Sequence, residues 1–186
     1  VLFASNPDNV GVALYARNSD TNTVTLSHLW AASRSVNLDI GSDYNTISFS
    51  TMIGRDSFGL WINSASASNT VTQTYMSGMA DGLRLGNGSD YNTISLSTII
   101  AGSNYALYIG GSDSNIVAQS YMRGGQYGVY VDAGSDYNTI SLSTVIGNSQ
   151  YGLYSVSSDS NIVTQSYMWG GQFGIYLYAG SDYNTI

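Results

Sequence analysis

Seven aspartates return at nearly constant spacing and are the most regular polar feature of this chain. They are Asp20, Asp43, Asp90, Asp113, Asp136, Asp159 and Asp182, and Ala67 stands where the series skips a member. Stacked carboxylates could bind Ca²⁺, which takes several oxygen ligands at about 2.3–2.6 Å. The G-G-x-G-x-D repeat of calcium-binding rolls is absent, however, and aspartate also fixes turns by bonding nearby backbone amides. The turn role is the simpler interpretation; a Tm that millimolar Ca²⁺ or chelator leaves unmoved would exclude the metal.

Aromatic side chains recur at a similar spacing and suggest a binding surface. One series contains Trp61, Tyr108, Tyr130, Tyr154 and Tyr176, with Arg84 in the same row, and a flanking series contains Phe58, Tyr105, Tyr127, Tyr151 and Phe173. Tyrosine and tryptophan combine apolar area with a polar tip, so the row could hold sugar rings or a protein partner. Cross-strand contacts between the rings could equally serve to stabilise a sheet. Both roles remain open.

Hydroxyl side chains form a third regular array. Its members are Thr46, Ser48, Ser50, Thr70, Thr72, Thr74, Thr93, Ser95, Ser97, Thr139, Ser141 and Ser143. The array resembles the faces of ice-binding β-helices, but Ile116, Ala118 and Ile162 interrupt it. Ice binding is therefore a remote alternative to an ordinary solvated face.

Residues suited to catalysis are scarce. The chain has no Cys, Lys or Glu, and a single histidine, His28, is weak evidence for catalysis. Arg55 with Asp56 and Arg84 near Asp81 are the only pairs of the kind that a polysaccharide lyase would need. A glycosidase needs two carboxylates about 5–9.5 Å apart at a cleft, whereas the repeats look interchangeable. We therefore expect no catalytic residue, no enzymatic activity and no cofactor.

A repeated unit must position all of these residues. The sequence G-S-D-Y-N-T-I occupies residues 41–47 and returns at 88–94, 134–140 and 180–186, with a weaker copy between each pair. The spacing is 23 residues with one step of 24, and such a period indicates a solenoid. Within residues 89–111, short runs of alternating polarity are divided by Gly, Ser and Asn, which predicts three strands and three corners per coil.

Three columns of apolar residues are predicted to point inward and stack between coils, because a single coil cannot bury its own apolar face. The first is Val24, Ile47, Val71, Ile94, Val117, Ile140, Val163 and Ile186. The second is Leu29, Met52, Met76, Ile99, Met122, Val145 and Met168; the third is Leu60, Leu83, Leu107, Val129, Leu153 and Ile175. Gln73, Gln119 and Gln165 alternate with Phe49, Leu96 and Leu142. At an inward position these glutamines would need hydrogen-bond partners; the alternative is that their coils bulge locally there.

The pattern S-D-x-N-T-I, then S-T-I, then Y-G-L-Y-I resembles the short-repeat branch of the right-handed parallel β-helix superfamily, with its pectate-lyase-like fold. The resemblance covers about residues 10–186 and implies an all-β, right-handed parallel β-helix (β-solenoid) of about eight coils and three parallel sheets. The superfamily includes enzymes, surface proteins and carbohydrate-binding modules. It also implies an asparagine ladder at one corner, made of Asn22, Asn45, Asn69, Asn92, Asn115, Asn138, Asn161 and Asn184.

Composition narrows the partners and the location. The charged residues are five Arg and twelve Asp, giving a net charge of −7, so nucleic acid is excluded by the lack of a basic stripe. No apolar run is long enough to insert into a membrane. Absent cysteine and abundant Ser, Thr, Asn, Gly and Tyr favour an extracellular or cell-surface protein.

These observations combine into one functional hypothesis. Residues 1–186 form a single β-solenoid domain, with a partial coil at 1–18, seven coils at 19–180 and the start of another at 181–186. We expect an uncapped segment of a longer repeat protein, serving as the rigid shaft of a large extracellular protein in adhesion or in lateral or end-to-end assembly. The expected partners are further copies of the repeat and surface polysaccharide. The alternative is a carbohydrate-binding or polysaccharide-cleaving β-helix whose active residues lie outside this segment.

Overall fold

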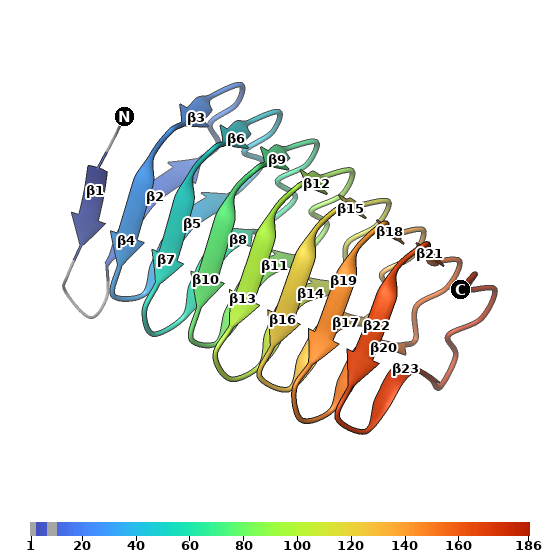
Figure 1. The fold of residues 1–186 in the computed structure, drawn as a ribbon. Coiled ribbons are helices and arrows are strands. Elements are labelled where there is room, and N and C mark those ends of the chain that lie inside the picture. The colour runs from blue at the N-terminus through green and yellow to red at the C-terminus, as the bar shows by residue number, and fades with distance from the viewer. Residues whose placement is uncertain (1–2, 7–10) are drawn as a thin grey trace.

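The chain winds into a right-handed parallel β-helix with three parallel sheets and no helix among the residues described (Figure 1). The computed structural model describes residues 3–6 and 11–186; the remaining six residues belong to the predicted partial coil and lie outside this description. Each coil contributes one strand to each sheet, as the 23-residue period predicted. The all-β solenoid prediction is confirmed.

Three sheets, named here A, B and C, run the length of the rod. Sheet A contains β1 (Phe3–Asn6), β4 (His28–Ala31), β7 (Thr51–Gly54), β10 (Tyr75–Gly78), β13 (Thr98–Ala101), β16 (Tyr121–Gly124), β19 (Thr144–Gly147) and β22 (Tyr167–Gly170). Sheet B contains β2 (Val12–Arg17), β5 (Arg34–Asp39), β8 (Phe58–Ile62), β11 (Asp81–Gly86), β14 (Tyr105–Gly110), β17 (Tyr127–Asp132), β20 (Tyr151–Val156) and β23 (Phe173–Tyr178). Sheet C contains β3 (Thr23–Thr25), β6 (Thr46–Ser48), β9 (Thr70–Thr72), β12 (Thr93–Ser95), β15 (Ile116–Ala118), β18 (Thr139–Ser141) and β21 (Ile162–Thr164).

The register places like residues on like, as the repeat requires. Ile94 of β12 pairs with Val71 on one side and Val117 on the other, while Met76 of β10 lies between Met52 and Ile99. The predicted stacks form one continuous core, in which most members are fully buried. Met168 and Ile175 are only partly buried and Ile186 is 60% exposed, because they lie in the last coil. Sheet B adds an inward column that was not predicted: Leu38, Ile62, Leu85, Ile109 and Val131.

Of the two alternatives for the glutamine column, the inward position is wrong. Gln73, Gln119 and Gln165 are exposed, and their φ angles are +48°, +50° and +48°. Phe49 occupies the same corner at φ +48° and is 53% exposed. A left-handed residue turns the chain between sheets C and A and interrupts the strict in–out alternation, so this column leaves the core.

No helix that is long and apolar enough to cross a membrane occurs within residues 3–6 and 11–186.

Candidate functional site

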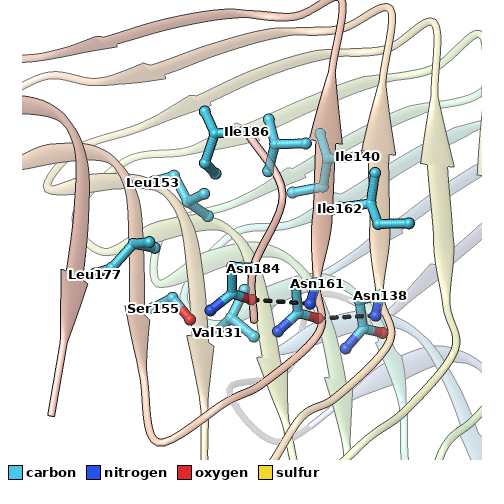
Figure 2. Close-up of a pocket in the computed structure, with 11 residues that line it drawn as sticks. Val131, Asn138, Ile140, Leu153, Ser155, Asn161, Ile162, Leu177, Asn184 and Ile186 are labelled. Carbon is cyan, nitrogen blue, oxygen red and sulfur yellow. Dashed lines mark hydrogen bonds between the residues drawn. The ribbon is translucent and has the colours of Figure 1, made fainter. Parts of the chain in front are cut away.

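The asparagines of the repeat lie at the corner that precedes sheet C and form a ladder along the rod. In each step the side-chain Oδ1 of one asparagine accepts a hydrogen bond from the backbone N–H of the asparagine one coil earlier. Asn69 N–H donates to Asn92 Oδ1 at 2.9 Å, and Asn92 N–H donates to Asn115 Oδ1 at 2.8 Å. The equivalent distances elsewhere along the ladder are 2.8–2.9 Å. Figure 2 shows the last two steps, from Asn138 to Asn184.

The small hollow in Figure 2 lies inside the coil, between this ladder and the aliphatic stacks. Its volume is about 10 Å³, which is room for at most a single water molecule. The interior of the rod therefore offers no site for a larger ligand at this place.

The aspartate column forms a second ladder that runs in the opposite direction. Asp113 N–H donates to Asp90 Oδ1 at 2.7 Å, Asp136 N–H to Asp113 Oδ1 at 2.8 Å, and Asp159 N–H and Asp182 N–H continue the series at 2.7 Å. Ala67 stands where the column lacks an aspartate, but its backbone N–H still donates to Oδ1 of Asp43 in the preceding coil. These bonds give the stacked carboxylates a structural use. Among the residues described, no three His, Asp, Glu or Cys side chains come together as a metal site.

The two aromatic series form a packed double row on the outer face of sheet B. Tyr108 pairs with Tyr130, Tyr130 with Tyr154, and Tyr154 with Tyr176. Their ring centroids are 5.8, 5.0 and 5.6 Å apart. The flanking rings fill the spaces between them; the centroid of Tyr105 lies 4.9 Å from that of Tyr130. All the rings except the exposed Phe173 are partly buried, so the row both stabilises the sheet and presents a broad aromatic surface.

Partial burial within this row raises the pKa of Tyr105, Tyr108, Tyr127, Tyr130 and Tyr154 above the ordinary tyrosine value. A raised pKa means that the fold favours the neutral phenol, so this stabilisation is complete below about pH 10 and is lost as pH rises through the folded-state values. We expect these tyrosines to ionise late in an alkaline titration followed by tyrosinate absorbance, and the free energy of unfolding to fall over the same range. Ionisation of all sixteen tyrosines together near the ordinary pKa, with the fold intact, would contradict this.

An ion pair interrupts the aromatic row at Arg84. Its Nη1 lies 3.0 Å from Oδ2 of Asp81, whose side chain is only 1% exposed. The guanidinium also lies over the ring of Tyr108, 4.0 Å from the centroid. Burial raises the pKa of Asp81, and the charge and hydrogen bond of Arg84 oppose that rise. The pair separates the aromatic part of the outer face, over β14 to β23, from a more polar part over β2, β5 and β8.

The polar half contains a hollow of about 390 Å³ over β2, β5 and β8. Side chains that line it include Tyr15, Arg34, Asn37, Asp39, Trp61 and Asn63. Strand register places Tyr15, Asn37 and Trp61 side by side. The same column of sheet B continues to Tyr108 and Tyr130 in later coils. The small side chain of Asn37 between two large rings opens the surface at this point.

Sequence reasoning missed this hollow, although a signal was present. Asn37 and Arg34 break the repeat at positions where later coils carry aromatic residues, and unique residues in a regular array are where specific chemistry is expected. The aromatic series was begun at Trp61, so its continuation through Asn37 to Tyr15 was not recognised. Only the register of β2, β5 and β8 shows that these residues share one column.

The remaining candidates lie elsewhere. Within the hydroxyl array, Ser50, Thr74, Ser97 and Ser143 are buried at a corner, where their hydroxyls accept hydrogen bonds from backbone N–H groups or donate to carbonyls. The rest lie on sheet C. His28 is exposed on β4 of sheet A. Arg55 and Asp56 form an exposed pair at 2.8 Å in a loop. None of these residues lines the hollow over sheet B.

Comparisons with known proteins place the chain among β-helix proteins. A family model described as periplasmic copper-binding protein (NosD) matches residues 67–186. No curated protein matches the chain. A double mutant of the periplasmic alginate epimerase AlgG superposes with a TM-score of 0.78 over 87% of this chain and 39% of that one, at 16% identity. For the A-module of the Azotobacter vinelandii mannuronan C-5 epimerase AlgE6, the TM-score is 0.83 over 99% and 56%, at 13% identity.

A third solved structure, the enzymatically active domain of bacteriophage CBA120 tailspike protein 2, has a TM-score of 0.62 over 91% of this chain and 37% of its own, at 11% identity. This chain thus spans between about two fifths and just over half of these relatives' length, and the likeness shows the shared fold.

The likeness to these structures also corrects the expectation of no enzymatic activity. The solved structures with this fold include enzymes. The regularity of the coils is therefore no argument against catalysis.

The copper in the family description requires donors that this chain does not bring together. Copper sites use imidazole, thiolate or thioether ligands. The chain has one His and no Cys. Met52 and Met76 are fully buried, with Leu29 and Ile99 as their outer neighbours in the stack. The residues that the structure describes therefore do not fit a copper centre.

Proposed function

The chain belongs to the NosD family, and from this premise we propose that its β-helix is a rigid rod that binds polysaccharide along the outer face of sheet B. The observation that carries the proposal is the continuity of that face. An aromatic double row runs from Phe58 and Trp61 to Phe173 and Tyr176, with the Arg84–Asp81 ion pair replacing both rings on β11, and it meets the polar hollow at its N-terminal end.

An extended sugar polymer suits such a face. Sugar rings have apolar faces that pack on aromatic rings, and hydroxyl edges that hydrogen-bond to tyrosine tips and to polar residues. Successive rings in the row follow the coil spacing of about 4.8 Å. One polymer chain running along the rod would meet a ring at each coil from β14 to β23, and would meet Asp81 and Arg84 instead of rings at β11. The net charge of −7 and the absence of a basic stripe favour sugar over nucleic acid as the polymer.

The rest of the molecule supports a rod that holds this face in place. The asparagine and aspartate ladders join neighbouring coils through buried or partly buried hydrogen bonds, and the apolar stacks do the same through packing. Stiffness of this kind suits the shaft role predicted from the repeat, with adhesion to polysaccharide as its purpose. The family description agrees with the predicted location outside the cytoplasm.

Triple substitution of Tyr108, Tyr130 and Tyr154 by serine tests the proposal. We expect a loss of at least about tenfold in polysaccharide affinity, because buried aromatic contacts dominate such surfaces. Affinity electrophoresis against a panel of neutral and acidic polysaccharides measures it. The matched control replaces Tyr44, Tyr91 and Tyr137 by serine; these are each 65% exposed at another corner, where serine already stands in alternate coils. Equal losses in both triple variants, or unchanged binding in the first, would refute the proposed site.

A further inference from the structure

The polar hollow over β2, β5 and β8 concentrates unsatisfied hydrogen-bonding groups in one place. Four buried side-chain atoms within the described residues have no hydrogen-bond partner: Arg34 Nε, Asn37 Oδ1, Asp39 Oδ1 and Trp61 Nε1. All four belong to residues that line this hollow. Asn37 is 4% exposed, so its unpartnered oxygen is held within the protein. Buried polar groups are normally paired with protein or with ordered water, so four such atoms around one hollow mark a place where a polar ligand could form several hydrogen bonds.

The chemistry of these four atoms describes that ligand. Arg34 Nε and Trp61 Nε1 are donors, whereas Asn37 Oδ1 and Asp39 Oδ1 are acceptors. A simple anion would satisfy the donors but would face the carboxylate, and a simple cation would face the guanidinium. Vicinal hydroxyl groups satisfy both kinds of atom, because each hydroxyl donates and accepts. Trp61 supplies an aromatic ring at the same place, with Arg34 stacked over it at 4.2 Å.

The charges in the hollow balance one another. Asp39 accepts a 2.8 Å hydrogen bond from Tyr15 Oη. Burial acts to raise the pKa of Asp39, but hydrogen bonds from Tyr15 and neighbouring donors outweigh it and hold the pKa below the ordinary value, so the carboxylate is ionised at neutral pH. One carboxylate and one guanidinium give a net charge of zero, within a chain whose total charge is −7.

We infer that this hollow binds one neutral sugar unit and sets the sugar specificity of the face. The inference rests on the proposed function and names the unit that the polymer must contain. Tyr15 is 52% exposed, and its hydroxyl donates to Asp39 Oδ2, so its ring adds an aromatic surface beside the hollow. A uronate would bring its carboxylate against Asp39, so acidic sugars should bind at least about tenfold more weakly than neutral ones.

The experiment compares neutral and uronate hexasaccharides by isothermal titration with the whole chain and its variants. The neutral probes are hexamers of glucose, mannose and galactose; the acidic probes are hexamers of mannuronate and galacturonate. Asn37→Tyr restores the aromatic residue of the repeat and fills the hollow, and we expect it to lower the affinity for the preferred neutral hexamer at least tenfold. Arg123→Ala is the control, since it removes an exposed arginine from sheet A.

Asp39→Asn supplies a readout that misfolding would not imitate. It leaves Arg34 unbalanced, so we expect the preference to shift toward the uronate hexamers by about tenfold or more while the neutral hexamers weaken. Equal binding of neutral and acidic hexamers by the wild type, or no change in preference in Asp39→Asn, would overturn the inference. If polysaccharide binding depends on Tyr108, Tyr130 and Tyr154 but not on Asn37, the proposed function stands and this inference falls. If no polysaccharide or hexamer binds the wild type, both fall.

Discussion

Replacing Asn92 with alanine should lower the free energy of unfolding by about 3 kcal/mol, because it leaves buried polar groups of two neighbouring coils without partners. Asn92 is fully buried. Its Oδ1 accepts from the backbone N–H of Asn69 at 2.9 Å, and its Nδ2 donates to Ser89 O at 2.9 Å and to Asn115 Oδ1 at 3.1 Å. Urea denaturation of the folded rod measures the loss.

Asn22→Ala is the matched control for that variant. Asn22 belongs to the same ladder but is exposed, so water can replace the bonds that its side chain makes. We expect a loss below about 1 kcal/mol for this control. Similar losses at both positions would mean that the ladder contributes no more than a surface asparagine does.

Replacing Arg84 with methionine should cost about 3 kcal/mol at neutral pH, because it strands the buried carboxylate of Asp81. Arg84 is the ion-pair partner of that carboxylate and opposes the rise that burial causes in its pKa. Without Arg84 the pKa of Asp81 rises further. A carboxyl group with a raised folded-state pKa is best tolerated below its unfolded value of about 4, and its destabilising effect grows as pH rises through the folded-state pKa.

The stability of Arg84→Met relative to wild type should therefore recover as pH falls. Urea denaturation at neutral pH and near pH 4 measures this change. The double variant Asp81→Asn with Arg84→Met removes both charges and should regain much of the stability at neutral pH. A deficit that is independent of pH, and that the double variant shares in full, would show that packing of the arginine on Tyr108 matters more than the ion pair.

The fold was predictable because every coil repeats the sequence pattern of the same three strands and three corners. The columns through Ile94 and Met76 followed from alternation alone, since strict alternation decides which side chains face inward. Alternation does not predict the side chain of Gln73, because alternation assumes an extended backbone. Gln73 has a left-handed φ of +48°, which turns its side chain outward. A polar residue that alternates with Phe49 and Leu96 along the coils is better explained by an exposed corner than by an unsatisfied core position.

The site was harder to predict than the fold, for a physical reason. The sequence showed the row from Tyr108 to Tyr176 because its members repeat, but the hollow consists of residues that do not repeat. Arg34, Asn37 and Asp39 come together with Tyr15 and Trp61 only through the pairing of three coils. Their missing hydrogen bonds depend on packing, which no spacing rule contains. Positions where the repeat breaks are therefore the best sequence signal for a specific binding site in this rod.

Hydroxyl-radical footprinting with mass spectrometry can show whether polysaccharide lies along the outer face of sheet B. The rod is labelled with and without the polysaccharide that binds it best in affinity electrophoresis. We expect protection of Trp61, Tyr108, Tyr130 and Tyr154, with unchanged labelling of Tyr44, Tyr91 and Tyr137 at the corner and of Tyr121 on sheet A. Protection confined to the corner tyrosines or to sheet A, or no protection at saturating polysaccharide, would contradict it.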